Sequence, residues 1–405
     1  MRYAHITGWG KYLPQRVMTN DDLARIVETS DAWIRERTGI VERHIAGESE
    51  TTASMAIAAA MEALNVAGVS GGQLDLIVVA TATPEHIFPS TACFVQDALG
   101  ADRAGAFDLS AACAGFVYGL SVAADAIKAG SADTALVIGA ETLSRIVNWD
   151  DRSTCVLFGD GAGAVVLQAR DQPGGVLSTL LRADGSGSEL LMLPAGGSKI
   201  PITPQVLEQR LNTIKMNGRE VYRFASRVIE RATREVMHKA GWTAEQVDLF
   251  VPHQANLRII ESAARSLNIP MERVFCNIQH YGNTSAASIP IALAEAAAAG
   301  RLRPNDRVVM VGFGGGLTWA AAAVQWSELG TPSRSRRVFS RIGYQWASLR
   351  SRARRVLRHV EDRLFGTADT APQNGKREKD PVRPHAERPL ETNSAAQPAQ
   401  KTPER

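Results

Sequence analysis

The chain has 405 residues, enough for one large core or for two fused halves. Its four cysteines, Cys93, Cys113, Cys155 and Cys276, show no paired spacing, which argues against a zinc site and against a disulfide framework. The first residues lack the apolar core of a signal peptide, and no apolar run reaches about 18 residues. We therefore expect neither a signal peptide nor a transmembrane helix, and a reducing cytoplasmic setting.

Strand-like and helix-like runs alternate along residues 1 to about 330. The expected strands are 74–82, 105–109, 134–140, 248–252, 307–312 and 317–325, and the expected helices are 51–67, 114–129, 220–240, 257–267 and 285–299. This alternation favours a layered α/β fold. The order of helix, strand, glycine-rich turn and strand occurs twice, once after Cys113 and once after Asn283, with a shared Phe-Gly-x-Gly element at 158–161 and 313–316. Many α/β chains show such an order, but the shared element favours duplicated halves whose helix starts meet at one centre.

The C-terminal part differs in composition. Residues 331–405 contain 17 Lys and Arg against 8 Asp and Glu, whereas the preceding 330 residues contain 28 against 34. Apolar residues recur at spacings of three and four from Phe339 to Leu364 among many arginines, which predicts a basic amphipathic helix over 330–366. Residues 367–405 are rich in Pro, Gln, Ala, Thr and charge, which is typical of disorder.

Cys113 lies at the end of a strand and the start of a helix, inside the run Phe-Asp-Leu-Ser-Ala-Ala-Cys-Ala-Gly-Phe at 107–116. The unpaired N–H groups of a first helical turn stabilise a thiolate, and the small neighbours allow another molecule to approach the sulfur. A small apolar core cysteine fits the same run. His253 follows a strand, Asn283 follows a glycine turn, and Gly312–Gly316 ends a strand. Each also has a purely structural interpretation: His253 as a structural histidine, Asn283 as a helix N-cap, and Gly312–Gly316 as a tight turn.

Together these runs resemble the β-ketoacyl-acyl carrier protein synthase III family, the condensing enzymes of thiolase fold that start fatty-acid synthesis. The resemblance covers residues 1 to about 328 and rests on six blocks in order: 31–34, 37–40, the Cys113 run, 253–258, 282–285 and 313–316. It implies an α/β fold of two duplicated thiolase-like halves, 1–172 and 173–329, in α-β-α-β-α layers, and a homodimer. The Cys-His-Asn set differs from the Cys-His-His set of the elongating enzymes.

The resemblance also implies the chemistry. Cys113 would take the acyl group from acyl-CoA, with the backbone N–H groups of Cys113 and Gly315 facing the oxyanion. Malonyl-acyl carrier protein would then lose CO₂, and His253, neutral, and Asn283 would donate hydrogen bonds to the enolate oxygen. The carbanion would attack the acyl group on Cys113. No cofactor and no metal ion are expected.

Further contacts follow from the same resemblance. The expected CoA-binding residues are Thr29, Trp33, Arg37, Arg152 and Asn256, with Trp33 and Arg152 on either side of the adenine. The expected carrier-protein contacts are Gln254 and Arg258. Phe88 resembles the residue that reaches across the dimer into the acyl pocket of the other subunit. For each arginine a solvated surface charge is the plain alternative.

The family ends near Trp326, so the predicted basic helix needs its own explanation. It could bind a membrane surface through residues 333–366, dock an acidic partner such as the carrier protein, or pack on the enzyme itself or on another copy. Nucleic acid is not expected as a partner. Two other functions stay open: a related condensing enzyme or acyltransferase of a specialised lipid or secondary-metabolite pathway, and a non-catalytic scaffold. The scaffold would not need the Cys-His-Asn set.

Overall fold

Two mixed β-sheets form the framework of the chain, and a computed structural model describes them within residues 1–327. The first sheet has the order β1–β7–β6–β4–β5 and the second the order β11–β12–β13–β8. In both sheets parallel strands (β5, β4 and β6; β11 and β12) are followed by two antiparallel neighbours. The pattern that repeats in the sequence thus corresponds to the same strand arrangement in the two sheets.

The strands and helices agree with the predicted runs to within a few residues. The strands of the two sheets are β1 (Tyr3–Tyr12), β4 (Leu76–Ala80), β5 (Gly105–Leu109), β6 (Thr134–Glu141), β7 (Gly161–Arg170), β8 (Gly175–Ala183), β11 (Leu249–Pro252), β12 (Arg307–Gly314) and β13 (Thr318–Gln325). The long helices are α3 (Thr52–Ala67), α4 (Thr91–Leu99), α5 (Gly115–Ala129), α8 (Gly218–Lys239), α9 (Leu257–Leu267) and α11 (Ser288–Ala298). Smaller elements are β2 (Arg16–Thr19), β3 (Glu42–Ile45), β9 (Leu191–Met192), β10 (Lys215–Met216), α1 (Asn20–Ala24), α2 (Asp31–Thr38), α6 (Arg152–Cys155), α7 (Pro204–Glu208) and α10 (Ile278–Tyr281).

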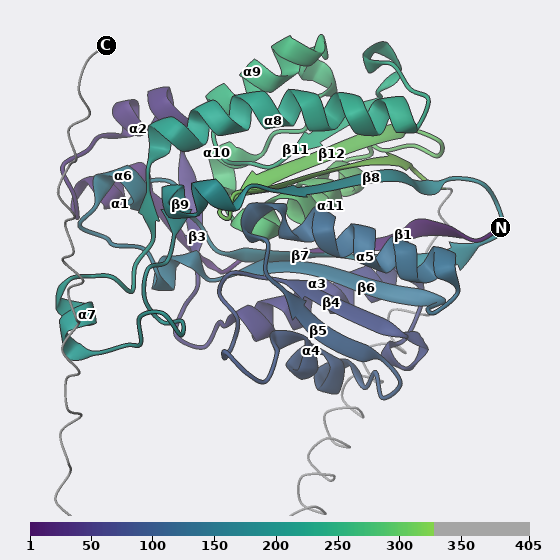
Figure 1. Ribbon diagram of the computed structural model, residues 1–405, viewed down its shortest axis with the longest axis horizontal. Helices are drawn as coiled ribbons and strands as arrows, with labels where there is room; N and C mark the ends of the chain where they lie inside the picture. Colours follow the sequence, from purple (N-terminus) through teal and green to yellow (C-terminus); the bar gives the residue numbers. More distant parts are fainter. Residues whose placement is uncertain (328–405) are drawn as a thin grey trace, which may run out of the picture. The chain divides into compact units, whose positions relative to one another are not determined.

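The layers follow the predicted α-β-α-β-α order (Figure 1). Helices α5 and α11 lie between the sheets, α3 and α4 cover the outer face of the first sheet, and α8 and α9 cover the second. The central helices approach the first sheet closely because it carries glycine where they cross. A Cβ atom at Gly139 would lie 2.1 Å from the carbonyl oxygen of Ala286, and one at Gly163 would lie 2.5 Å from the backbone nitrogen of Ile291.

One helix within residues 1–327, Ala112–Ala129, is long and apolar enough to cross a membrane by length and composition. It contains α5, and 61% of that stretch is buried inside the protein. Its apolar side chains fill the layer between the two sheets, as expected of a core helix.

The division into halves at 172 and 173 stays a prediction. The predicted basic helix at 330–366 and the predicted disordered tail at 367–405 lie outside the described residues.

Candidate active site

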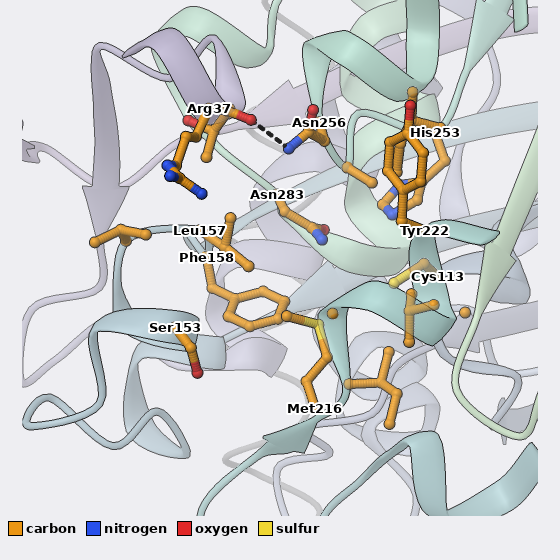
Figure 2. A pocket seen from close by; sticks show the side chains of 18 of the residues that line it. Arg37, Cys113, Ser153, Leu157, Phe158, Met216, Tyr222, His253, Asn256 and Asn283 are labelled. Atoms are coloured by element: carbon orange, nitrogen blue, oxygen red, sulfur yellow. Dashed lines mark hydrogen bonds between the residues drawn. The ribbon is translucent and has the colours of Figure 1, made fainter. Parts of the chain in front are cut away.

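A cavity of about 440 Å³ opens at the start of the two central helices, and residues far apart in the sequence line it (Figure 2). The predicted site residues that line it are Trp33, Arg37, Cys113, Arg152, His253, Asn256 and Asn283. Thr29, Phe88, Gln254, Arg258 and Gly315 lie outside this lining, although Gly314 belongs to it.

Cys113 occupies a single 3-10 turn, Ala112–Ala114, between β5 and α5, as the strand-to-helix pattern predicts. Ala112 has a φ of 44°, in the left-handed region that residues other than glycine rarely adopt, so the turn is strained. Gly314 lies against the turn, because a Cβ atom there would be 2.6 Å from the backbone nitrogen of Cys113. The glycine-rich run therefore shapes the wall beside the sulfur.

The Cys113 side chain is buried, at 5% exposure. Burial raises its pKa from 9.0 to about 12, although hydrogen bonds from Ser285 and from the Cys113 backbone N–H lower it in part. Burial and the N–H groups at the start of the helix therefore act on the pKa of Cys113 in opposite directions.

His253 directly follows β11, and its ring is buried at 2% exposure. Its backbone N–H donates to Val311 O at 2.8 Å, and its Nδ1 lies 2.6 Å from Ser288 Oγ. Burial lowers the pKa of His253 to about 3, so the imidazole is neutral at neutral pH. When the Ser288 hydroxyl donates to Nδ1, the proton of the ring sits on Nε2, which can donate into the cavity.

Asn283 is held in place by both its backbone and its side chain. Its N–H donates to Leu157 O at 2.8 Å, and its carbonyl oxygen accepts from Gly159 N at 3.1 Å. Its Oδ1 accepts from Ser285 N at 2.8 Å, which is the contact expected if Asn283 were only the N-cap of a helix. The Nδ2 amino group remains available as a donor, and Figure 2 shows the Asn283 amide near the Cys113 sulfur and the His253 ring.

The two residues predicted to sandwich the adenine, Trp33 and Arg152, both line the cavity, as does Arg37, which was predicted along the rest of the CoA molecule. Trp33 and Arg37 come from α2, and Arg152 begins α6. Both guanidinium carbons lie 4.9 Å from the Trp33 ring centroid. A stacked ring sits about 3.5–4 Å from its neighbour, so an adenine between Trp33 and Arg152 needs roughly twice that separation. Arg152 therefore has to shift for the predicted sandwich to form.

Asn256 lines the cavity, whereas Thr29 does not. Asn256 donates from Nδ2 to Arg37 O at 2.9 Å (Figure 2), and its Oδ1 caps α9 by accepting from Arg258 N at 2.9 Å. Both polar groups of Asn256 are thus already bonded within the protein. The Thr29 Oγ1 atom is buried and has no hydrogen-bond partner within the protein.

The predicted carrier-protein contacts separate into one surface residue and one interior residue. Arg258 is half-exposed and bonds Glu36 through its guanidinium group. Gln254 is 1% exposed, donates to Pro252 O at 2.7 Å and accepts from Asn277 N at 3.0 Å. The Gln254 side chain thus orders the loop after β11, and its role as a carrier-protein contact stays a prediction.

Phe88 lies between β4 and α4 and is 85% exposed, as is its neighbour Ile87. Such an exposed apolar pair is unusual on a free surface and is typical of a contact site.

Three polar residues of the site were not predicted. Ser288 bonds the ring of His253, and the pKa of the Cys113 thiol is lowered by Ser285 and raised by the charge of Glu141. The two serines belong to the Tyr281–Ser288 run, whose serines at the start of a buried helix were the available signal. For Glu141 the signal was a carboxylate at the end of a strand that is apolar from Ala135 to Ala140.

The layered fold and the Cys-His-Asn cavity define a condensing enzyme of the thiolase fold, which is an acyltransferase. A family model described as 3-oxoacyl-[acyl-carrier-protein] synthase III matches residues 107–185, and the model of its C-terminal part matches 237–326. Beta-ketoacyl-[acyl-carrier-protein] synthase III of Roseiflexus sp. (strain RS-1) is 53% identical over 325 residues, which are 80% of this chain and 99% of that protein. The chain belongs to the 3-oxoacyl-[acyl-carrier-protein] synthase III family, whose reaction initiates fatty-acid synthesis.

Solved structures agree with this membership. The crystal structure of 3-oxoacyl-[acyl-carrier-protein] synthase III from Aquifex aeolicus is 52% identical, with a TM-score of 0.75, and the match covers 80% of this chain and 100% of that one. A priming β-ketosynthase from a polyketide biosynthetic pathway is 36% identical, with a TM-score of 0.76, and the match covers 82% and 98%.

Proposed function

We propose that Cys113 accepts an acyl group from acyl-CoA and that malonyl-acyl carrier protein then condenses with it, giving a β-ketoacyl product and CO₂. The observation that carries the proposal is the convergence of three groups in one cavity. These are the buried thiol of Cys113, the neutral ring of His253 and the free amino group of Asn283. The reaction needs no metal or cofactor, because a thioester carbonyl is already reactive and departure of CO₂ needs no base.

In the first half of the reaction, Cys113 Sγ attacks the thioester carbon and CoA leaves. The developing oxyanion needs donors placed beforehand, and the backbone N–H groups of Cys113 and Gly315 fit this role. The contact of Gly314 with the Cys113 turn supports it, because that contact brings the glycine-rich run beside the sulfur.

In the second half, loss of CO₂ leaves a thioester enolate. Two donors in the cavity can bind its oxygen, the Nε2–H of His253 and the Nδ2 group of Asn283. The low pKa of His253 supports this assignment, because a neutral imidazole donates to the enolate without protonating it fully. The enolate carbon attacks the acyl carbonyl, and Cys113 leaves.

For CoA we propose that Trp33 and Arg152 part to take the adenine between them. Arg37 and the free hydroxyl of Thr29 would contact the nucleotide, and the backbone around Asn256 would contact the pantetheine arm. Thr29 Oγ1 has no partner within the protein, but it is buried outside the cavity lining, so its contact with CoA requires a local movement that exposes it.

We also propose a second copy of the chain and the carrier protein as partners. The exposed Ile87 and Phe88 pair supports a homodimer in which Phe88 reaches the acyl pocket of the partner subunit. Arg258 would exchange its bond to Glu36 for an acidic group of the carrier protein. The four unpaired cysteines are compatible with the cytoplasmic location that we propose.

Residues 333–366 are proposed to bind a membrane surface or an acidic partner, or to pack on the enzyme itself or on another copy. Deletion of 331–405 should leave turnover in solution nearly unchanged and should weaken binding to anionic vesicles or to the carrier protein. An unfolded deletion product would favour packing on the enzyme body.

The proposal is tested by intact-protein mass spectrometry after incubation with acyl-CoAs from acetyl to long chain. We expect a mass gain of one acyl group that is absent in Cys113→Ala. The chain length that reacts fastest names the primer. The 36% identity to a priming β-ketosynthase of a polyketide pathway makes such a pathway the second candidate, which an unusual primer would favour. Absence of any adduct would contradict the proposed acyl donor.

A further inference from the structure

A carboxylate on α11 receives hydrogen bonds from three other segments of the chain, and the proposed reaction gives it no role. Glu295 accepts from Asn277 Nδ2 at 2.8 Å and from Tyr281 OH at 2.5 Å. It also forms an ion pair with Lys11 of β1, and its side chain is 19% exposed. Burial alone would raise the pKa of Glu295, but the three donors outweigh burial, and the pKa lies below its ordinary value of 4.5. Glu295 is therefore charged at neutral pH.

The bond from Tyr281 holds the turn that presents Asn283. Tyr281 ends α10, and Gly282 and Asn283 follow it directly. Gly282 has a φ of 63°, in the left-handed region, so the chain turns sharply between the two side chains. Lys11 Nζ lies 5.4 Å from the centroid of the Tyr281 ring, on the way to its own bond with Glu295. The hydroxyl of Tyr281 thus ties the Asn283 turn to α11.

The bond from Asn277 leads in the same way to His253. The backbone N–H of Asn277 donates to Gln254 Oε1 at 3.0 Å, and Gln254 directly follows His253. Gln254 Nε2 donates to Pro252 O at 2.7 Å, on the other side of His253 in the chain. Asn277 is 5% exposed and Gln254 is 1% exposed, so both bonds lie away from water. Asn277 therefore connects Glu295 with the loop that carries the His253 ring.

One face of α11 holds both donors of the cavity. Ser288, the first residue of α11, lies 2.6 Å from His253 Nδ1 through its Oγ. Glu295 is seven residues further on, about two helical turns, so it lies on the same face as Ser288. An enolate oxygen that binds two donors at once depends on their relative placement. A shift of about 1 Å in such a placement can cost about 10²-fold in rate.

We propose that Glu295 is a positioning residue for decarboxylation, which holds the His253 and Asn283 donors at the separation that the enolate oxygen requires. It does not touch the substrate. It acts on Asn283 through Tyr281, and it acts on the loop of His253 through Asn277. The inference rests on the proposed function, because it takes both side chains as donors to the enolate.

Two near-isosteric variants test this role in isolated acyl-enzyme. Tyr281→Phe removes only the hydroxyl that bonds Glu295 and should slow single-turnover release of CO₂ from malonyl-acyl carrier protein about tenfold. Glu295→Gln weakens both connections and should slow it about 10²-fold. Acylation, followed by intact mass, should keep the wild-type rate in both variants, because the Cys113 turn packs against Gly314 instead. Wild-type decarboxylation in either variant, or an equal loss in both half-reactions, would overturn the proposal.

A second substitution separates positioning from stabilisation of the fold. In an Asn283→Ala background, Tyr281→Phe should slow decarboxylation by about twofold at most, because the donor that Tyr281 positions is gone. A tenfold loss that persists in this background would overturn the proposal. Asp75→Asn is the matched control. Asp75 is 25% exposed and accepts from Asp133 N at 2.9 Å and from Thr134 N at 3.1 Å, at the amino end of β4. It should lose stability and keep both rates, and an equal loss of decarboxylation there would also count against Glu295.

The same assay separates failure of this inference from failure of the proposed function. If wild-type acyl-enzyme releases no CO₂, or if Asn283→Ala releases it at the wild-type rate, the proposed function is contradicted and the inference with it. If Asn283→Ala is slow while Tyr281→Phe and Glu295→Gln match the wild type, only the positioning role of Glu295 is overturned. Slow decarboxylation with normal acylation in all three variants is the result that we expect.

Discussion

Removal of the Ser288 hydroxyl tests how His253 is held for catalysis. Ser288 Oγ lies 2.6 Å from His253 Nδ1, and both residues are 2% exposed. The Ser288→Ala substitution removes the hydrogen bond to His253 Nδ1, so the ring is no longer held with its proton on Nε2. A buried polar atom left unpaired costs about 1–3 kcal/mol, so the free energy of unfolding should fall by that amount.

Ser288→Ala should slow decarboxylation less than His253→Ala, which removes the whole imidazole ring. A neutral hydrogen bond contributes about 0.5–1.5 kcal/mol, which corresponds to about 2- to 12-fold in rate. We therefore expect decarboxylation of malonyl-acyl carrier protein by pre-acylated Ser288→Ala to slow about tenfold. His253→Ala should slow it about 10²–10³-fold, as for loss of an oxyanion donor. Acylation of Cys113 should be nearly unchanged in Ser288→Ala.

Single-turnover release of CO₂ from isolated acyl-enzyme measures this step directly. Ser178→Ala provides the control, because Ser178 is also buried and donates at 2.7 Å to Val236 O, between β8 and α8. It should lose similar stability and keep the rate. Decarboxylation at the wild-type rate in Ser288→Ala, or an equal loss in Ser178→Ala, would refute this reasoning.

Three further predictions concern the same cavity. Asn283→Ala should acylate Cys113 normally but decarboxylate about 10²–10³-fold more slowly, as two half-reaction assays would show; an equal loss in both would exclude its role as a donor to the enolate. The pKa of His253 lies at about 3, below its unfolded value of 6.5, so decarboxylation should stay flat between about pH 5 and pH 8. A rate inflection near pH 6.5 would contradict burial of the neutral ring. For the same reason, the stabilisation of the fold by neutral His253 is present above about pH 6.5 and is lost as pH falls toward 3, which urea titrations at several pH values would follow. Gly314→Ala puts a Cβ atom 2.6 Å from Cys113 N and should suppress acylation. Gly72→Ala is the control, because no atom lies within 4 Å of its Cβ position, and it should acylate normally. Normal acylation in Gly314→Ala would show that the Cys113 turn moves to accommodate the added atom.

Local sequence patterns predicted the elements that carry the nucleophile. The strand at 105–109 and the helix after Cys113 both exist, because β-rich and Ala-rich runs act over a few residues. The burial of Cys113 could not be predicted in the same way. The helix start acts locally and is visible in the sequence, but the desolvation that raises the pKa of Cys113 comes from strands and helices elsewhere in the chain.

Gln254 and Glu141 also have partners that could not be predicted from the sequence around them. Gln254 is polar and follows a strand end, yet the Phe275–Asn277 segment supplies its partners and turns it inward. Glu141 ends an apolar strand, and its donors come from residues 81–83 and from Ala286. Contacts between segments this far apart follow from the packing of the layers, which a single sequence does not specify.

The central claim is that Cys113 holds the acyl group that the enolate then attacks. Acyl-enzyme freed of all acyl-CoA should be mixed with malonyl-acyl carrier protein and followed by intact mass. The account predicts that one β-ketoacyl carrier protein forms for each acyl group lost from Cys113. Product formation with the adduct still in place, or loss of the adduct as free acid without condensation, would contradict it.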